Sequence, residues 1–287
     1  MRRILLTIAA LVALASVGIE AQWLNYKTPG VPRTADGKPK LDAPAPRTTD
    51  GHPDLSGTWM HELTSVAEVR RLFGPRIDEE INVDVPGMEI GTQHKYLFNI
   101  LVDVQPQDSP LRPETVKLLE QRAREAAAAP LCNTGAPPGF PIAGLLSEPI
   151  KVVQAPRLTM IVYEVGNAYR QIYTDGRKLP AEINLPSYYG YSVGRWERDT
   201  FVVETALFNG KTPLDAMGHP RSDQMHIVER FRRRDFGHLD VEMTFDDPKF
   251  YTRPFTVRIP HELVADGDIF ESFPENEKDC ARISAKK

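Results

Sequence analysis

The chain of 287 residues carries 35 basic and 39 acidic side chains, a formal net charge of −4, and hydrophobic residues make up 41% of it. This mild acidity excludes a general attraction to nucleic acid or to anionic lipid. The length suits one large β domain or two small ones, and the composition is that of a globular protein apart from its 25 prolines.

The first residues have the pattern of a secretory signal peptide. Arg2 and Arg3 precede an apolar run at 4–17, which is shorter than the roughly 20 residues of a membrane-spanning helix. We therefore expect residues 1–21 to be removed on export, so that the mature protein is periplasmic or secreted and is not inserted in a membrane. An uncleaved anchor is the alternative.

Residues 22–56 predict a proline-rich arm with an internal repeat. PRTADGKPKL at 32–41 and PRTTDGHPDL at 46–55 share seven of ten positions. In each copy Asp-Gly favours a tight turn and the prolines impose extended backbone. We expect two turns whose Leu41 and Leu55 dock on the domain. A flexible linker is the alternative.

The segment 64–130 predicts a helical insert. Ser65 and Glu68 form a capping box for its first helix. The stretch 92–104 is apolar and favours a helix. Pro113 to Ala129 gives the clearest helix, because proline suits a first turn and another proline directly follows the segment.

After a loop at 133–149 the apolar period changes to two, in segments rich in Val, Ile, Thr, Tyr and Phe that turn signals separate. Residues 57–262 therefore predict a mainly β fold. It is an antiparallel meander that closes into a lipocalin-like barrel or a strongly curved sheet, with the helices over one end or side and a tail at 263–287. The predicted strands are 150–155, 157–165, 167–174, 191–197, 199–206, 225–233, 238–245 and 255–259.

Two resemblances accompany this pattern. Gly57-Thr58-Trp59 resembles the Gly-X-Trp of the first strand in lipocalin-type barrels, although the large insert departs from simple lipocalins. The stretches "PDLSGTW", "GYSVGRWERDTFVVET", "ERFRR" and "DDPKFYTRP" resemble a group of uncharacterised bacterial secreted proteins over most of the mature chain. The second resemblance implies no activity and transfers no catalytic residue.

One strand places a carboxylate on an apolar face. Glu229 alternates in step with three apolar residues of its strand, so we expect it inside the barrel, paired with Arg170 or Arg195. Glu204 is a similar case on the preceding strand. Such carboxylates can do acid/base work, whereas structural ion pairs are the alternative.

Acid/base side chains crowd one loop and the strand after it, at Asp215, His219, Asp223, His226 and Glu229. We take His226, Glu229 and Asp215 as candidate catalytic residues. His226 and Glu229 fall on opposite faces of a strand, and the spacing matches no metal signature, so we predict neither a metal nor a cofactor. A hydrogen-bonded loop is the alternative.

Aromatic residues with polar tips can stack on sugars or flat ligands at a pocket mouth. The candidate ligand-binding residues are Tyr188, Tyr189, Tyr191 and Trp196, together with Arg170 and Glu204. Ordinary core and loop positions are the alternative for the aromatic residues.

Three further features have structural interpretations that involve no catalysis. Gly190 to Gly194 spells the Gly-X-Ser-X-Gly of serine hydrolases, but a hairpin pattern follows instead of a helix, so Ser192 is expected to be a strand serine. The basic run at 230–234 predicts a solvated strand face. Export permits a disulfide between Cys132 and Cys280, and two unpaired thiols are the alternative.

Three functions follow from this reading. The first is an exported protein that binds a small-molecule ligand inside the barrel. The second is a hydrolase, lyase or isomerase with acid/base residues at the barrel mouth. The third is a structural or interaction protein that uses the arm. No nucleic-acid partner is expected.

Export gives a direct prediction. Because cleavage removes a signal peptide, the intact mass of the extracted protein should correspond to a chain that begins near Ala21 or Gln22. Soluble protein that retains Met1 would contradict export.

Overall fold

The computed structural model describes residues 27–62, 64–73, 94–128, 149–164, 168–215 and 217–269. The insert after the first strand contains short helices, and the remaining strands follow it. In chain order the elements are β1 (Gly57–His61), α2 (Val66–Phe73), α4 (Lys95–Phe98), the 3₁₀ helix η2 (Pro106–Asp108), α5 (Pro113–Ala128), β2 (Ile150–Ala155), β3 (Leu158–Tyr163), β4 (Ala168–Tyr173), β5 (Tyr191–Glu197), β6 (Thr200–Ala206), β7 (His226–Arg233), β8 (His238–Asp246) and β9 (Phe255–Leu263).

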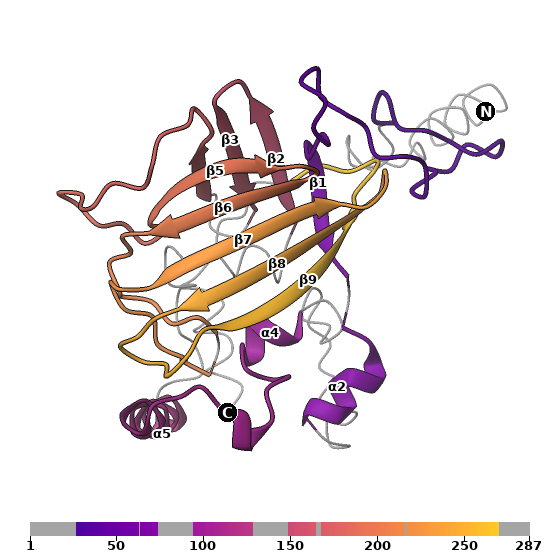
Figure 1. Ribbon diagram of the computed structural model, residues 1–287. Helices are drawn as coiled ribbons and strands as arrows, with labels where there is room; N and C mark the ends of the chain where they lie inside the picture. Colours follow the sequence, from indigo (N-terminus) through magenta and orange to yellow (C-terminus); the bar gives the residue numbers. More distant parts are fainter. Residues whose placement is uncertain are drawn as a thin grey trace, which may run out of the picture.

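The strands form a closed barrel in chain order, and β1 closes it by pairing with both β2 and β9 (Figure 1). The predicted barrel is therefore confirmed. The expectation of a purely antiparallel meander is wrong at one place, because β4 and β5 run parallel. Parallel neighbours need a crossover connection, and residues 174–190 supply it.

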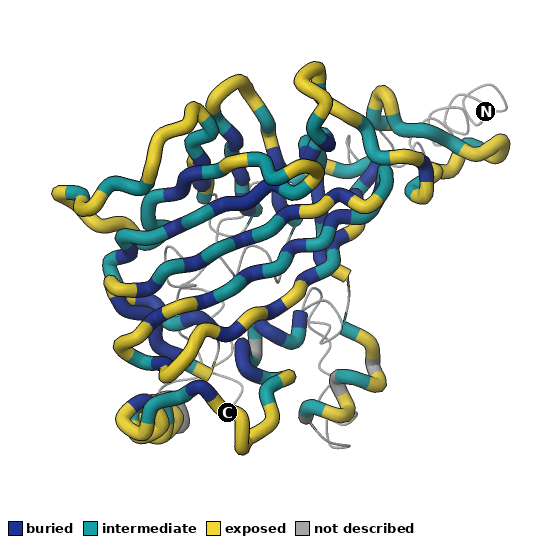
Figure 2. Tube along the Cα trace, in the orientation of Figure 1, coloured by how far each residue is buried: buried dark blue, intermediate teal, exposed yellow. Residues whose placement is uncertain are grey.

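The barrel interior is filled by alternating side chains. Along β8 the residues Leu239, Val241, Met243 and Phe245 are buried, and the residues between them are more exposed. Figure 2 shows the same alternation along β7 and β9. A barrel of this size leaves just enough room for side chains to pack, and each large apolar side chain that leaves water contributes roughly 1.5–3 kcal/mol.

Helices lie at the end of the barrel opposite the arm (Figure 1). The long predicted helix is confirmed within one residue as α5. Of the predicted helix at 92–104, the described residues 94–104 are helical only in α4, because the Asn99 side chain accepts the Leu101 N–H at 2.9 Å and forms a turn there. No helix in the described part of the chain is long and apolar enough to cross a membrane.

The two copies of the repeat fold in the same way. Each closes a small bridge, Arg33 with Pro39 and Arg47 with Pro53. The glycine of each turn, Gly37 or Gly51, has φ near +85°, a conformation that glycine adopts without strain. In both copies the arginine donates to that glycine's carbonyl, at 3.0 and 2.7 Å.

The same arginines tie the arm to the barrel loops. Arg33 pairs with Asp266 after β9, and Arg47 pairs with Asp199 in the turn between β5 and β6. The two leucines contact the domain to different extents. Leu55 is 1% exposed, whereas Leu41 is only partly buried against the core. The described part of the arm is therefore docked, as the repeat predicted.

The repeat provides a matched pair of substitutions. Leu55→Ala should lower the free energy of unfolding by about 2–4 kcal/mol, because it leaves a cavity in the core. Leu41→Ala at the equivalent position should cost about 1 kcal/mol, since its side chain is less buried. Urea unfolding measures both, and equal losses would contradict the docking of Leu55.

Candidate functional site

A buried ion pair crosses the barrel interior. Arg170 on β4 donates to Glu229 on β7 through Nη1 and Nη2, at 2.8 and 2.9 Å, and the side chains are 3% and 0% exposed. Burial alone would lower the pKa of Arg170, but the Glu229 carboxylate outweighs this and raises that pKa. The expected burial and pairing of Glu229 are confirmed.

Two polar atoms beside this pair lack a hydrogen-bond partner among the described residues. They are Oη of Tyr163 on β3 and Nε of Arg170, and both are buried. Burial raises the pKa of the Tyr163 hydroxyl. The ring of Tyr189 stacks on Tyr163 with 5.8 Å between the ring centroids.

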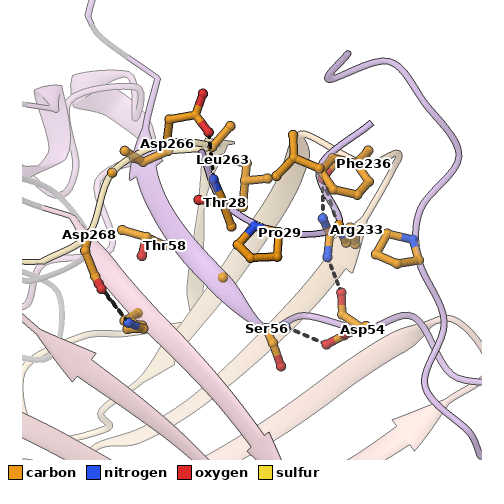
Figure 3. A pocket seen from close by; sticks show the side chains of 18 residues that line it. Thr28, Pro29, Asp54, Ser56, Thr58, Arg233, Phe236, Leu263, Asp266 and Asp268 are labelled. Atoms are coloured by element: carbon orange, nitrogen blue, oxygen red, sulfur yellow. Dashed lines mark hydrogen bonds and ion pairs between the residues drawn. The ribbon is translucent and has the colours of Figure 1, made fainter. Parts of the chain in front are cut away.

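A pocket of about 420 Å³ lies at the end of the barrel opposite the helices, where the arm contacts the barrel (Figure 3). Its walls come from residues 28–31 of the arm, from the start of β1, and from residues 263–268 at the end of β9 and beyond it. Much of the lining is apolar and includes Pro29, Val31, Phe236 and Leu263. The arm therefore forms one side of this cavity, which we call the arm pocket.

Arg233 at the end of β7 lines the arm pocket. It donates to the carbonyl oxygens of Asp54, at 2.5 Å, and of Phe236, and its guanidinium lies 4.8 Å from the centroid of the Trp59 ring. Burial lowers its pKa to about 10. The expectation of a solvated basic run is therefore wrong for Arg233, because strand alternation turns it inward with Glu229.

The charges around the arm pocket are largely matched. Asp266 pairs with Arg33 and also accepts the Thr28 N–H at 3.0 Å. Asp268 pairs with Lys151 at 2.8 Å. The pocket therefore presents an apolar wall with a balanced polar rim.

The structure does not bring the candidate catalytic residues together. Glu229 is inside the barrel, and His226 lies on the outer face of β7, 3.8 Å from Glu204. Asp215 lies in the loop before β7, where its carboxylate is 2.5 Å from Nδ1 of His219 and accepts the Ile100 N–H at 2.6 Å. This local arrangement matches the hydrogen-bonded loop that was the alternative.

Glu204 is on the outer surface, where it pairs with Arg195. The expectation that it faces inward is wrong. Residues 201–203 of β6 are all apolar and buried, so the sequence leaves the inward row of this strand ambiguous. Val203 faces Glu229 on the neighbouring strand, and Glu204 therefore points outward.

The aromatic residues do not form one platform. Tyr189 reaches Tyr163, while Tyr191 stacks on Tyr173 at a centroid distance of 5.2 Å and accepts a hydrogen bond from Arg177. Trp196 stacks on His52 of the arm, 4.6 Å away. The carbonyl oxygen of Tyr188 accepts a hydrogen bond from Arg221. Of the predicted ligand-binding residues, Arg170 is part of the buried pair, and Tyr189 packs on Tyr163 beside it.

Ser192 is a buried strand residue, as expected, and its hydroxyl is 2.9 Å from the hydroxyl of Thr205. Cys132 and Cys280 lie outside the described residues. Within the described ranges, no group of three or more metal-binding side chains is arranged to hold an ion.

Three histidines that the sequence analysis did not identify lie close together at the end of the barrel next to the helices. His61 pairs with His261 across β1 and β9, and His94 precedes α4 with its ring 5.6 Å from that of His61. Burial, followed by the nearby His61, His261 and Lys95, lowers the pKa of His94 to about 3. These residues are far apart in sequence, so no local pattern identifies them.

Comparison of the chain with known protein families found no matching family, and comparison with curated proteins and with solved structures found no match.

The buried pair gives a mutational prediction. Glu229→Gln should lower the free energy of unfolding by about 3 kcal/mol or more, because it leaves the Arg170 charge buried without its partner. Glu204→Gln is the matched control on the outer surface and should cost under about 1 kcal/mol. Thermal and urea melts measure both, and a Glu229→Gln variant as stable as the control would contradict the structural role.

The histidine cluster predicts acid sensitivity. The folded state keeps His94 neutral down to about pH 3, whereas the unfolded chain protonates it near pH 6.5. The unfolded state therefore binds more protons in that window, and stability should fall with pH by up to about 1.4 kcal/mol per unit from this residue. His94→Asn keeps a capping side chain and should flatten the dependence between pH 6 and pH 4.5. Urea midpoints across this range test it, and parallel curves would contradict it.

Proposed function

We propose that this is an exported binding protein that holds a small, uncharged and largely apolar molecule in the arm pocket. The observation that carries the proposal is the cavity of about 420 Å³ with an apolar wall between the arm and the barrel end. Pockets for small ligands typically have about 300–1,000 Å³ and a mostly apolar lining with few polar groups.

The chemistry of the lining supports an uncharged ligand. Asp266 and Asp268 already have basic partners. The charge of Arg233 is held by backbone carbonyls and by the Trp59 ring. Arg233 has no ion-pair partner among the described residues, but its Nε, Nη1 and Nη2 groups already donate to carbonyl oxygens. A charged ligand would therefore lose its hydration here for few new hydrogen bonds. An apolar body can bury its surface against Pro29, Val31 and Phe236.

The location differs from the interior site that the sequence favoured. The described interior is filled by core side chains such as Phe231 and Met243, whereas the arm pocket lies at the barrel end. The separation of Glu229, His226 and Asp215 gives no support to an acid/base site. Export is supported by the N-terminal pattern of Arg2, Arg3 and the apolar run.

A pocket-filling substitution tests the proposal. Val31 lines the arm pocket, and Val153 is an exposed valine outside it. N-phenyl-1-naphthylamine, an uncharged fluorescent probe, should bind the wild type saturably. Val31→Trp should weaken binding at least about tenfold, because the larger ring occupies the cavity, and Val153→Trp should leave it unchanged. Equal binding by both variants would contradict the proposal.

A further inference from the structure

The shortest ladder of the barrel wall is between β4 and β5. The two strands share only the pairs Ile172 with Ser192 and Tyr173 with Val193. The antiparallel pairing of β3 with β4, by contrast, runs along the whole length of both strands. Residues 168–171 of β4 therefore have no ladder on the side of β5. We call the junction between β4 and β5 the seam.

Tyr189 comes from the connection that leads into β5 at the seam. Its side chain is partly buried and packs on the core. Its ring is nearly parallel to that of Tyr163, at an interplanar angle of 14° and a centroid distance of 5.8 Å, which is an offset stack. The Tyr189 ring, which comes from a loop, thus covers one face of the Tyr163 ring in the barrel interior.

Two buried donors that have no hydrogen-bond partner within the described ranges are on this side of the barrel. Tyr163 and Arg170 are inward residues of neighbouring strands, displaced by two positions in the register. Their unused groups are Oη of Tyr163 and Nε of Arg170. A buried donor left without an acceptor costs about 1–3 kcal/mol, so an oxygen that reached both would be stabilised.

Charge decides which kind of acceptor fits. Glu229 already matches the Arg170 guanidinium through two hydrogen bonds. A second carboxylate would add an unpaired buried charge, which is strongly unfavourable. A carbonyl oxygen supplies lone pairs without that charge. The chemistry of the place therefore favours a neutral acceptor on a planar ring.

We propose that the seam leads to a second binding site, in which a planar, uncharged molecule with a carbonyl oxygen displaces the Tyr189 ring. The ring lies against Tyr163, and the oxygen accepts hydrogen bonds from Tyr163 Oη and Arg170 Nε. This site shares no residue with the lining of the arm pocket and stands independently of the function proposed for that pocket.

The test uses three aromatic probes of similar size. Acetophenone has a neutral carbonyl oxygen, ethylbenzene has no acceptor, and benzoate has a charged carboxylate. Tyr189→Ala vacates the place of the ring, so calorimetry should show that it binds acetophenone at least tenfold more tightly than the wild type. In this variant, ethylbenzene and benzoate should each bind at least tenfold more weakly than acetophenone. Adding Tyr163→Phe should also cost about tenfold, because one hydrogen bond to the oxygen is lost.

Two controls keep the result specific. Tyr191→Ala, on the outer face, should behave as the wild type. Val31→Trp combined with Tyr189→Ala should retain acetophenone binding, so failure here is distinguishable from failure of the arm pocket. Thermal melts exclude variants that do not fold.

The proposal is overturned if Tyr189→Ala binds ethylbenzene as tightly as acetophenone, or if Tyr163→Phe leaves acetophenone binding unchanged. A crystal structure of Tyr189→Ala with acetophenone should show the oxygen between the two donors. A crystal structure with only a water molecule between the two donors, or with acetophenone bound only in the arm pocket, would also overturn the proposal.

Discussion

The closed barrel depends on the packing of Trp59 in its short first strand. Trp59 pairs with Ile150 on one side and with Leu263 on the other, so one residue joins both edges. Its indole N–H donates to the carbonyl of Leu55 at 2.9 Å, and the Arg233 guanidinium lies against its ring. The tryptophan thereby links closure of the sheet, docking of the arm at Leu55 and the position of Arg233, which lines the arm pocket. The five-residue strand β1 can pair with both open edges of the sheet because contacts on several sides hold its central side chain, Trp59, in place.

The buried ion pair lies next to the seam. Arg170 is on β4 at the seam, and Glu229 is on β7, the third strand beyond it. The pair therefore connects the two sides of the wall through the interior, where the backbone ladder is short. An interior pair of this kind gains little net stability over apolar packing. Removing either partner would leave the other charge buried without compensation, which is strongly unfavourable.

The sequence predicts the strands well because one apolar row alternates with one polar row along most of them. β8 is the clearest case, whereas β6 carries apolar residues in both rows, and the direction of Glu204 could not be read from it. Arg233 was predictable from the same alternation that places Glu229, but the basic run around it suggested solvent exposure. The docked turns followed from Asp-Gly and proline chemistry. The three histidines and the arm pocket could not be predicted, because each gathers residues from distant parts of the chain.

The pairing of β1 also bears on the order in which the barrel can assemble. Each strand from β2 to β9 pairs with the next strand in the chain, so these contacts close comparatively short loops. Both contacts of β1 join far more distant residues, Trp59 with Ile150 and Trp59 with Leu263, and chain entropy opposes such contacts. A sheet without β1 has unpaired edges at β2 and β9. Another copy of the chain can add to such edges, so the pairing of β1 protects this protein from aggregation.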